Sequence, residues 1–329
     1  MKVVITGSSG FMGSALIAQL RERGHEAHGI DVRSPRWRAP HPADHHCDIT
    51  DAQALDTLIA RLSPEVIVHL AARTDLSSDS VVKYSANIEG VIHLLCAAQR
   101  AGSVKRVLWT SSQLVSRVGR VPTHDLDFEP NNSYGESKVI GERIVRGLDG
   151  GGMEWVILRP TTVWGPGMSD HYVSLLRLLS QGRYFHAGGA RARKSFSYIY
   201  NAIYQIQSLM AAPSEQVHRQ TFYVADSEAI DLRGWCDALS DQLGARHARV
   251  IPKGAARALA KVGDALKATV APDFKFTSFR LRNILTPYVF DTRNLQAITG
   301  PLPHDQKAAV QATADWYLRV ANPALKERV

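Results

Sequence analysis

The sequence predicts an α/β fold in which a doubly wound parallel sheet occupies the N-terminal half and a smaller lobe follows. Short runs rich in Val and Ile alternate with stretches whose apolar residues recur at helical spacing. One run, Val66–Leu70, is almost continuously apolar, which is typical of a parallel strand covered on both faces. The composition, 45% hydrophobic and 21% charged, is that of a globular protein rather than a disordered one.

The expected elements of this sheet follow one another along the first half of the chain. In the first helix, Ala15, Leu16 and Leu20 are spaced for one buried face. The predicted strands are Val3–Thr6, Glu26–Asp31, Val66–Leu70, Val104–Thr110 and Trp155–Leu158. The predicted helices are Gly13–Arg23, Asp51–Leu62, Asn87–Ala101 and Ser133–Arg146. Strands that alternate with helices in this way form a parallel sheet with helices on both faces.

After Gly165 the pattern changes, because glycines and prolines interrupt the chain. Phe196–Ile199 is expected to be a strand that returns to the sheet, and Phe222–Val224 another. Helices and turns are expected from Leu232 to Leu285, with a final amphipathic helix at His304–Val320. We therefore expect a first domain at residues 1–165, joined by a strand and a helix near 195–225. Residues 166–194 and 226–329 would mostly form a smaller substrate-binding lobe.

The charge balance favours an anionic partner without naming one. Lys and Arg number 39 against 31 Asp and Glu, a net charge of +8, and a basic surplus attracts nucleic acid, acidic lipid or phosphorylated molecules. A basic surface without a partner is an equally good explanation. The sequence has no dense basic run and no motif of a nucleic-acid reader, so no nucleic-acid partner is expected.

The cysteines and the apolar runs point to a cytoplasmic protein. Cys47, Cys96 and Cys236 are too widely spaced for a disulfide framework or a zinc site. His41, His45, His46 and Cys47 are ligand-type residues without metal-binding spacing, so no metal is expected. No apolar run is long enough for a membrane span, and the first strand begins too early for a signal peptide, so no membrane partner is expected.

A glycine-rich turn follows the first predicted strand and opens the first helix. Residues Thr6–Gly13 have glycine at positions 7, 10 and 13, in the spacing G-x-x-G-x-x-G. Gly7 permits a tight turn, Gly10 lets the backbone approach a pyrophosphate, and Gly13 lets the helix pack closely. The N–H groups at the start of the helix then bind the anion. In this strand-turn-helix context the motif predicts a Rossmann domain that binds a nicotinamide dinucleotide.

Asp31, at the end of the second strand, favours NAD over NADP as that dinucleotide. A carboxylate at this distance from the glycines can accept both ribose hydroxyls and would repel a 2′-phosphate. Arg33, Arg36 and Arg38 lie nearby and can bind such a phosphate instead, which leaves NADP as the alternative. Asp48-Ile49 can cover the adenine, although an ordinary turn explains the aspartate almost as well.

Tyr134 and Lys138 lie four residues apart, on one face of the helix predicted for Ser133–Arg146. Free tyrosine has a pKa of about 10 and is a poor base at neutral pH. A nearby cation favours the phenolate, which would make proton transfer by Tyr134 feasible. Ser112, at the end of the preceding strand, supplies a hydroxyl that can hold the reacting oxygen.

Together these motifs resemble the extended branch of the short-chain dehydrogenase/reductase family, over nearly the whole chain. That branch typically epimerises, dehydrates or reduces sugars carried on a nucleoside diphosphate. The motifs that carry the resemblance are Thr6–Gly13, Asp31, Asp48-Ile49, His69–Ala72, Asn87, Thr110–Ser112, Tyr134 with Lys138, and Leu158–Pro166.

The resemblance implies a role for each matched residue. Tyr134 would be the acid/base, Lys138 would bind the nicotinamide ribose and tune Tyr134, and Ser112 would position the substrate hydroxyl. The residues that would contact NAD, besides Tyr134 and Lys138, are Gly7, Ser9, Gly10, Phe11, Met12, Gly13, Asp31, Asp48, Ile49, Leu70, Ala71, Ala72, Asn87, Ser111, Pro160, Thr162 and Val163. For Asn87 a helix cap, and for Ser111 a strand-end hydroxyl without a role, are the alternatives.

The chain departs from the family pattern on the substrate side. Sugar dehydratases of this branch carry Thr-Asp-Glu where this chain has Ser112-Gln113-Leu114, so the acid and base for water elimination are missing. Epimerase-reductases of the GDP-fucose type have a cysteine where this chain has Gln113, and a histidine shortly after the Gly-Pro turn. His171 lies a few residues beyond that turn, so this activity stays open. Gln113, Lys194 and either Arg280 or Arg282 are the candidates for contacting the substrate, the cations as a diphosphate clamp.

From these observations we hypothesise an NAD-dependent epimerase of a nucleoside-diphosphate sugar, which oxidises the sugar to a keto intermediate and reduces it again. One alternative is a dehydrogenase or reductase of a sugar nucleotide or of a non-sugar alcohol, including sterol types. Another is a protein that binds NAD but has lost its chemistry. The resemblance also implies a homodimer through Gly90–Ala101 and Ser137–Arg146. Leu94, Leu95, Val139 and Ile140 would then be partly exposed in the monomer, or else belong to its core.

Overall fold

The computed structural model describes residues 1–36, 38–76, 78–188, 192–269 and 276–321. Its centre is a seven-stranded sheet of order β11-β6-β5-β4-β1-β2-β3, parallel throughout. These strands are β1 Lys2–Thr6, β2 Glu26–Asp31, β3 Asp44–His46, β4 Val66–His69, β5 Arg106–Thr110, β6 Glu154–Pro160 and β11 Gln220–Val224. The predicted doubly wound α/β fold of Rossmann type is therefore confirmed.

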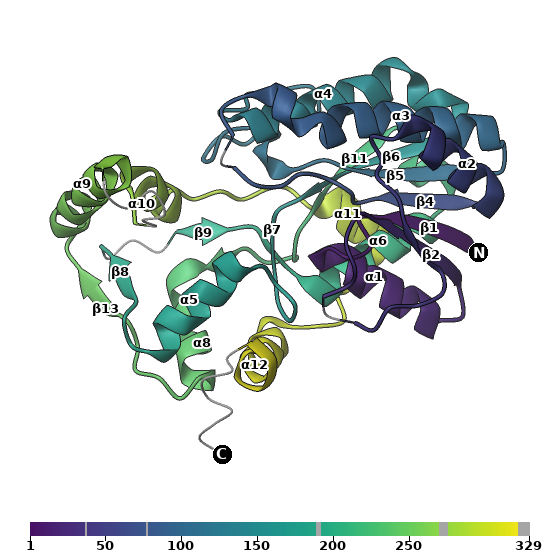
Figure 1. Cartoon of the computed structure of the whole chain (residues 1–329). Coiled ribbons are helices and arrows are strands. Elements are labelled where there is room, and N and C mark those ends of the chain that lie inside the picture. The colour runs from purple at the N-terminus through teal and green to yellow at the C-terminus, as the bar shows by residue number, and fades with distance from the viewer. Residues whose placement is uncertain (37, 77, 189–191, 270–275, 322–329) are drawn as a thin grey trace.

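Helices cover both faces of this sheet, as Figure 1 shows. One face carries α2 (Ala52–Leu62), α3 (Ser85–Ala101) and α4 (Ser133–Gly147), and the other carries α1 (Phe11–Glu22), α6 (Ile199–Ala211) and α11 (Arg293–Thr299). Successive strand residues point to opposite faces. In β1, Val3 and Ile5 accordingly join the α1 and α6 core, whereas Val4 joins the α2 and α3 core.

The second half of the chain adds a lobe of helices and short strand pairs. The lobe helices are α5 Asp170–Ser180, α8 Leu232–Gln242, α9 Lys253–Thr269, α10 Ser278–Leu285 and α12 Gln306–Trp316. The paired short strands are β7 Thr162–Trp164 with β10 Phe196–Tyr198, β8 Phe185–Ala187 with β13 Arg249–Ile251, and β9 Arg193–Lys194 with β12 Ile230–Asp231. Single turns complete the described elements: η1 Val81–Tyr84, η2 Gln113–Val115, η3 Asp149–Gly152, α7 Ser214–Val217 and the π-helix η4 Tyr317–Ala321.

One predicted strand does not return to the central sheet. β10 pairs with β7, outside the seven strands, and Ile199 already begins α6. The physical reason is that β11 occupies the free edge of β6, through Gln220–Val224 beside Val156–Pro160. The prediction of a strand at Phe222–Val224 is confirmed by β11.

The helices proposed for a dimer contribute apolar residues to the core of the single chain. Leu94 is fully buried, and Leu95 and Val139 are also buried, while Ile140 is half-buried. Partial exposure is therefore wrong for three of the four, and the homodimer stays a prediction.

Among the described residues, no helix combines the length and apolar character that a membrane crossing needs.

Candidate active site

The glycine-rich turn lies where the strand order of the sheet reverses. β1 is flanked by β2 on one side and by β4 on the other, and ligands of such sheets bind outside the carboxyl ends of the strands at this point. Gly7 N donates to Ile30 O at 2.8 Å, and Leu70 N donates to Thr6 O at 3.1 Å. The turn therefore joins the ends of all three strands.

Two positions of the turn admit only glycine. Gly7 has a φ of 71°, and a Cβ there would lie 2.6 Å from Ala71 N. A Cβ on Gly13 would lie 2.1 Å from Gly7 O. The backbone of the turn is therefore packed between the start of α1 and the loop after β4, with no room for a side chain at Gly7 or Gly13.

The start of α1 is open to an anion. Gly10 is the N-cap residue, no side chain caps the helix, and its first turn contains no acidic residue. The N–H groups at such a helix start, together with the helix dipole, favour a negative group such as a pyrophosphate. The predicted contacts of Ser9, Phe11 and Met12 with the cofactor lie in this segment.

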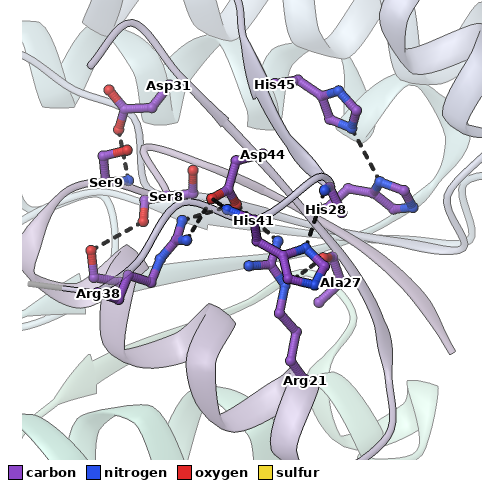
Figure 2. Close-up of polar contacts among 12 residues, drawn as sticks. Ser8, Ser9, Arg21, Ala27, His28, Asp31, Arg38, His41, Asp44 and His45 are labelled. Carbon is purple, nitrogen blue, oxygen red and sulfur yellow. Dashed lines mark hydrogen bonds and ion pairs between the residues drawn. The ribbon is translucent and has the colours of Figure 1, made fainter. Parts of the chain in front are cut away.

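Asp31 is joined to the glycine-rich turn, as Figure 2 shows. Its carboxylate accepts from Ser9 N at 2.9 Å and from Arg33 N at 2.9 Å. Arg38 does not contact it and instead pairs with Asp44 at 2.5 Å and 3.0 Å. The pair with Asp44 engages one of the arginines that would otherwise be free for a 2′-phosphate, which agrees with NAD.

Asp48 and Ile49 occupy different environments. Asp48 is exposed, and its carboxylate accepts from Thr50 N at 2.9 Å and from Thr50 Oγ1 at 2.8 Å, as a turn aspartate does. Ile49 is buried, and a Cβ on Gly90 would lie 2.5 Å from its Cδ1. The turn role of Asp48 is thus present, and the adenine contact stays a prediction.

Asn87 holds the loop after β4 against α4. Its Nδ2 donates to Arg73 O at 3.0 Å and to Ser137 Oγ at 2.9 Å, and its Oδ1 accepts from Arg73 N at 2.8 Å. Asn87 is buried inside α3, two residues after the helix begins, so the helix-cap alternative is wrong. Leu70, Ala71 and Ala72 belong to the loop that it positions.

Tyr134 and Ser112 are brought together by the close approach of α4 to η2. Ser112 ends up next to Tyr134 because Gly135 lies against η2, where a Cβ would be 2.2 Å from Leu114 O. Burial raises the pKa of Tyr134 to about 12, against the lowering effect of a hydrogen bond with the Ser112 side chain. Burial thus has the larger effect on the phenol, and the tuning of Tyr134 by Lys138 stays a prediction.

Lys138 extends from α4 to the end of β5, where its Nζ donates to Thr110 O at 2.9 Å. Burial lowers the pKa of Lys138 to about 8, although the Glu142 carboxylate raises it in part. Glu142 in turn receives two hydrogen bonds of 2.8 Å from the guanidinium of Arg159. These two charged residues are 3% and 1% exposed, so they form a buried ion pair behind the lysine.

A cavity of about 20 Å³ lies beside Lys138 and is lined by His69, Trp109 and Ser111, among others. His69 Nε2, Trp109 Nε1 and Ser111 Oγ have no hydrogen-bond partner within the described part of the chain. The space and its polar lining suit one water molecule. Ser111 thus borders a polar cavity, and its predicted contact with NAD stays a prediction.

The remaining cofactor candidates follow β6. Pro160 is the last residue of β6 and lies opposite Val224 of β11. Thr162 and Val163 belong to β7 and lie opposite Phe196 and Ser197 of β10. Both are half-buried, at the junction between the sheet and the lobe.

The predicted substrate residues are not equally available. Lys194 Nζ donates to the carbonyls of Asn283 at 2.7 Å and Thr286 at 2.8 Å, and burial lowers its pKa to about 8. Arg280 is half-buried, and burial lowers its pKa against the raising effect of Tyr172. Arg282 is exposed on the same helix. Lys194 therefore holds the end of α10, a role that the sequence did not reveal.

Gln113 begins η2 and contacts the lobe through its backbone. The Tyr288 hydroxyl donates to Gln113 O and Ser116 O, each at 3.1 Å. The segment after α10 is thus fixed beside Ser112. The side chain of His171, the other residue considered for the substrate, lies outside the described residues.

The histidines near β3 do not form a metal site. Among the described residues, no group of three or more His, Cys, Asp or Glu is arranged to hold a metal ion. Instead, His28 Nδ1 and His45 Nε2 lie 3.1 Å apart and their rings stack, with centroids 5.4 Å apart (Figure 2).

Residues 3–225 match the NAD dependent epimerase/dehydratase family. The chain belongs to this family. The predicted extended short-chain dehydrogenase/reductase and its cofactor NAD are thereby confirmed, and the chain is an enzyme of a family that contains both epimerases and dehydrogenases.

Curated relatives of the chain include both kinds of enzyme. The chain is 30% identical to a 3-beta-hydroxysteroid dehydrogenase of Mycolicibacterium neoaurum over 250 residues, which are 70% of this chain and 67% of the relative. It is 33% identical to a UDP-glucose 4-epimerase of Mycolicibacterium smegmatis over 189 residues, which are 52% of this chain and 59% of the relative.

Among solved structures, the chain is similar to a UDP-glucose 4-epimerase of Thermotoga maritima that contains UDP-glucose. The TM-score is 0.76 at 17% identity, over 98% of this chain and all of the other. At this identity the likeness establishes the fold of the family member and not its substrate.

The sequence did not predict the roles of several residues that shape the site. Gly135 lies within the Tyr134–Lys138 motif, and Arg159 lies within the motif Leu158–Pro166. Both residues therefore belong to motifs that the sequence revealed, but their roles could not be predicted. Gly135 acts through its contact with Leu114 O and Arg159 through its pair with Glu142, and both partners are distant in sequence. Tyr288 carried no signal of its own.

Proposed function

We propose that this chain transfers hydride between NAD and a secondary alcohol or the corresponding ketone, with Ser112, Tyr134 and Lys138 acting around the substrate oxygen. The observation that carries the proposal is the close packing of α4 on η2, which places the Ser112 hydroxyl by the buried Tyr134 phenol and so lowers the pKa of that phenol against the effect of burial. Two adjoining hydroxyls can hold one oxygen atom between them and exchange a proton with it. Bound NAD would supply the hydride donor or acceptor at the edge of the sheet marked by Gly7 and Gly13.

Tyr134 can act as the proton donor in the direction of reduction. With a pKa of about 12, its phenol is protonated at neutral pH and can donate a proton to the oxygen of a carbonyl that is being reduced. The carbonyl carbon would gain the hydride that NADH supplies, the oxygen would gain the phenol proton, and Tyr134 would then take a proton from solvent. Lys138 would hold the nicotinamide ribose and supply positive charge next to the transient phenolate.

For the substrate we infer an apolar carbonyl compound, bound against the lobe of residues 166–194 and 226–329. A diphosphate needs cations with free donors. Lys194, the first candidate for that task, gives two donors to backbone carbonyls of α10, and burial lowers its pKa to about 8. The alignment with the hydroxysteroid dehydrogenase also extends over 70% of the chain, against 52% for the UDP-glucose 4-epimerase.

Epimerisation of a nucleoside-diphosphate sugar is the second candidate. It is favoured by the higher identity to the epimerase, 33% against 30%, within the shorter aligned segment. The same three residues would then act twice, first taking the proton from the sugar hydroxyl and then returning it. No net change in NADH would accompany that reaction.

The experiment follows NADH while the purified protein is incubated with two substrate panels. One panel contains apolar ketones such as 3-oxosteroids and 2-alkyl-3-oxo acids, and the other contains UDP-, GDP-, CDP- and dTDP-sugars. The proposal predicts that a member of the first panel oxidises NADH. It should oxidise NADPH more slowly, because Asp31 repels a 2′-phosphate. Interconversion of a sugar at constant NADH would establish the second candidate instead. Bound NAD with neither reaction would identify a protein that has lost its chemistry.

A further inference from the structure

The positive charge of the chain is concentrated in one segment of the lobe. Residues 245–285 contain nine Lys and Arg but only two Asp and Glu. The other 288 residues contain 30 basic and 29 acidic residues, so this segment carries seven of the eight net positive charges. Such a concentration directs the molecule toward an anionic surface through this part of the fold.

Helix α9, in the middle of this segment, exposes an apolar face. Its inner face packs Ala256 and Ala260 against Ala187 of β8 and Leu281 of α10. On the outer side, Leu259 and Val262 are 49% and 57% exposed. The exposed apolar residues that share this side of the helix at 100° per residue are Ala255, Ala258, Leu259, Val262 and Ala265.

Two exposed cations of α9, Arg257 and Lys261, lie to one side of this apolar stripe at 100° per residue. Neither forms an ion pair within the residues that the structure describes. On the neighbouring α10, Phe279 is 48% exposed. Figure 1 places both helices at the outer end of the lobe, away from the seven-stranded sheet. An exposed apolar stripe with a basic border is typical of a helix that lies in the headgroup region of a membrane.

We propose that α9, together with α10, docks on the surface of an anionic lipid bilayer. Leu259 and Val262 would enter the headgroup and acyl boundary, while Arg257 and Lys261 would pair with lipid phosphates. A second copy of this chain is a poorer occupant, because two faces of the same strong positive charge repel each other. The docking is peripheral and involves no helix that crosses the bilayer.

The docking surface is connected to the catalytic residues through α10. Lys194 holds the carbonyls of Asn283 and Thr286 at the end of α10, and Tyr288 then donates to Gln113 O beside Ser112. A bilayer at α9 and α10 would therefore lie near the substrate side of the site. This connection rests on the proposed function, since an apolar carbonyl compound dissolved in lipid could reach the enzyme from that surface.

The test is sedimentation of the full chain with vesicles of phosphatidylcholine, with and without phosphatidylglycerol, at low and high salt. We expect binding to the anionic vesicles that weakens as salt rises. Leu259→Gln should weaken binding roughly tenfold through loss of one buried apolar side chain. Leu148→Gln is the matched control, since Leu148 is 53% exposed at the end of α4 and should not change binding. Removing both charges in Arg257→Gln/Lys261→Gln should cost about fivefold per residue.

Three results would overturn the proposal: no sedimentation with anionic vesicles at low salt, equal binding of the Leu259 and Leu148 variants, or equal binding to neutral vesicles at all salt concentrations. Dimerisation that Leu259→Gln abolishes, without vesicle binding, would assign this face to a second copy instead. Vesicle binding is measured without substrate, and ketone reduction is measured without vesicles. Failure of the reductase assay and failure of docking are therefore separate results.

Discussion

The sheet half of the molecule contains a buried ion pair, whereas the outer lobe carries exposed cations that form no ion pair among the described residues. Behind the candidate site, Arg159 and Glu142 are almost fully buried and bind each other with two hydrogen bonds of 2.8 Å. On α9, Arg257 and Lys261 are exposed and form no ion pair within the described ranges. In the first arrangement each charge is bound by a partner within the chain, whereas the second leaves charge available for a partner outside the chain.

The largest effect is expected at Tyr134. Tyr134→Phe removes the proton donor and should reduce kcat by about 100-fold to 10,000-fold, while NAD binding is retained. Steady-state kinetics with the best ketone measures the loss, and titration with NADH measures cofactor binding. Tyr204→Phe is the control, because the Tyr204 hydroxyl donates to Thr299 O, outside the candidate site. Equal losses in both variants would contradict the role of Tyr134.

The buried ion pair should matter for stability more than any surface pair. Glu142→Gln leaves the Arg159 charge buried without its partner and should lower the free energy of unfolding by about 3–5 kcal/mol. Asp56→Asn breaks the exposed pair with Arg100, 2.7 Å in length, and should cost less than about 1 kcal/mol. Urea denaturation measures the free energy of unfolding of both variants. Similar decreases in the two would show that burial does not make the Arg159–Glu142 pair more important than an exposed pair.

Lys138 gives the sheet half a defined dependence on pH. Its pKa is lowered to about 8 in the folded protein from 10.5, so between these values the unfolded chain binds the proton and the folded chain does not. Stability should therefore rise with pH across this window, by about 3 kcal/mol relative to Lys138→Met. Parallel curves for the two proteins would mean that the lysine is not desolvated.

The smallest effect is expected in the lobe, at Gly254. Gly254 lies in α9 with nothing within 4 Å of the position of a Cβ, so Gly254→Ala should stabilise the protein by about 0.4–1 kcal/mol. At Gly13 a Cβ would lie 2.1 Å from Gly7 O, and the same substitution should destabilise the protein and weaken NAD binding. Thermal unfolding with and without NADH distinguishes them, and stabilisation by both would contradict the packing of the turn.

The same difference explains what could be predicted from the sequence. The positions of Gly7, Gly13, Tyr134 and Lys138 depend on local strand-turn-helix geometry, which the spacing of residues expresses. The raised pKa of Tyr134 could not be predicted, because it depends on burial by residues that are distant in sequence.

The sequence of the lobe contains fewer motifs whose spacing expresses local geometry. The hydrogen bonds of Lys194 to α10 and the pairing of β10 with β7 join segments that no periodicity relates. The strand at Phe196–Ile199 was recognised by its composition but assigned to the wrong neighbour, since β11 already occupies the edge of β6.

The most direct test of the account is the transfer of deuterium from NADH labelled at the nicotinamide C4 to an apolar ketone. We predict one deuterium on the carbinol carbon for each NADH consumed, and the loss of this transfer in Tyr134→Phe but not in Tyr204→Phe. Absence of label in every alcohol, with sugar nucleotides interconverted at constant NADH, would contradict the assignment of this chain as a reductase of apolar carbonyl compounds.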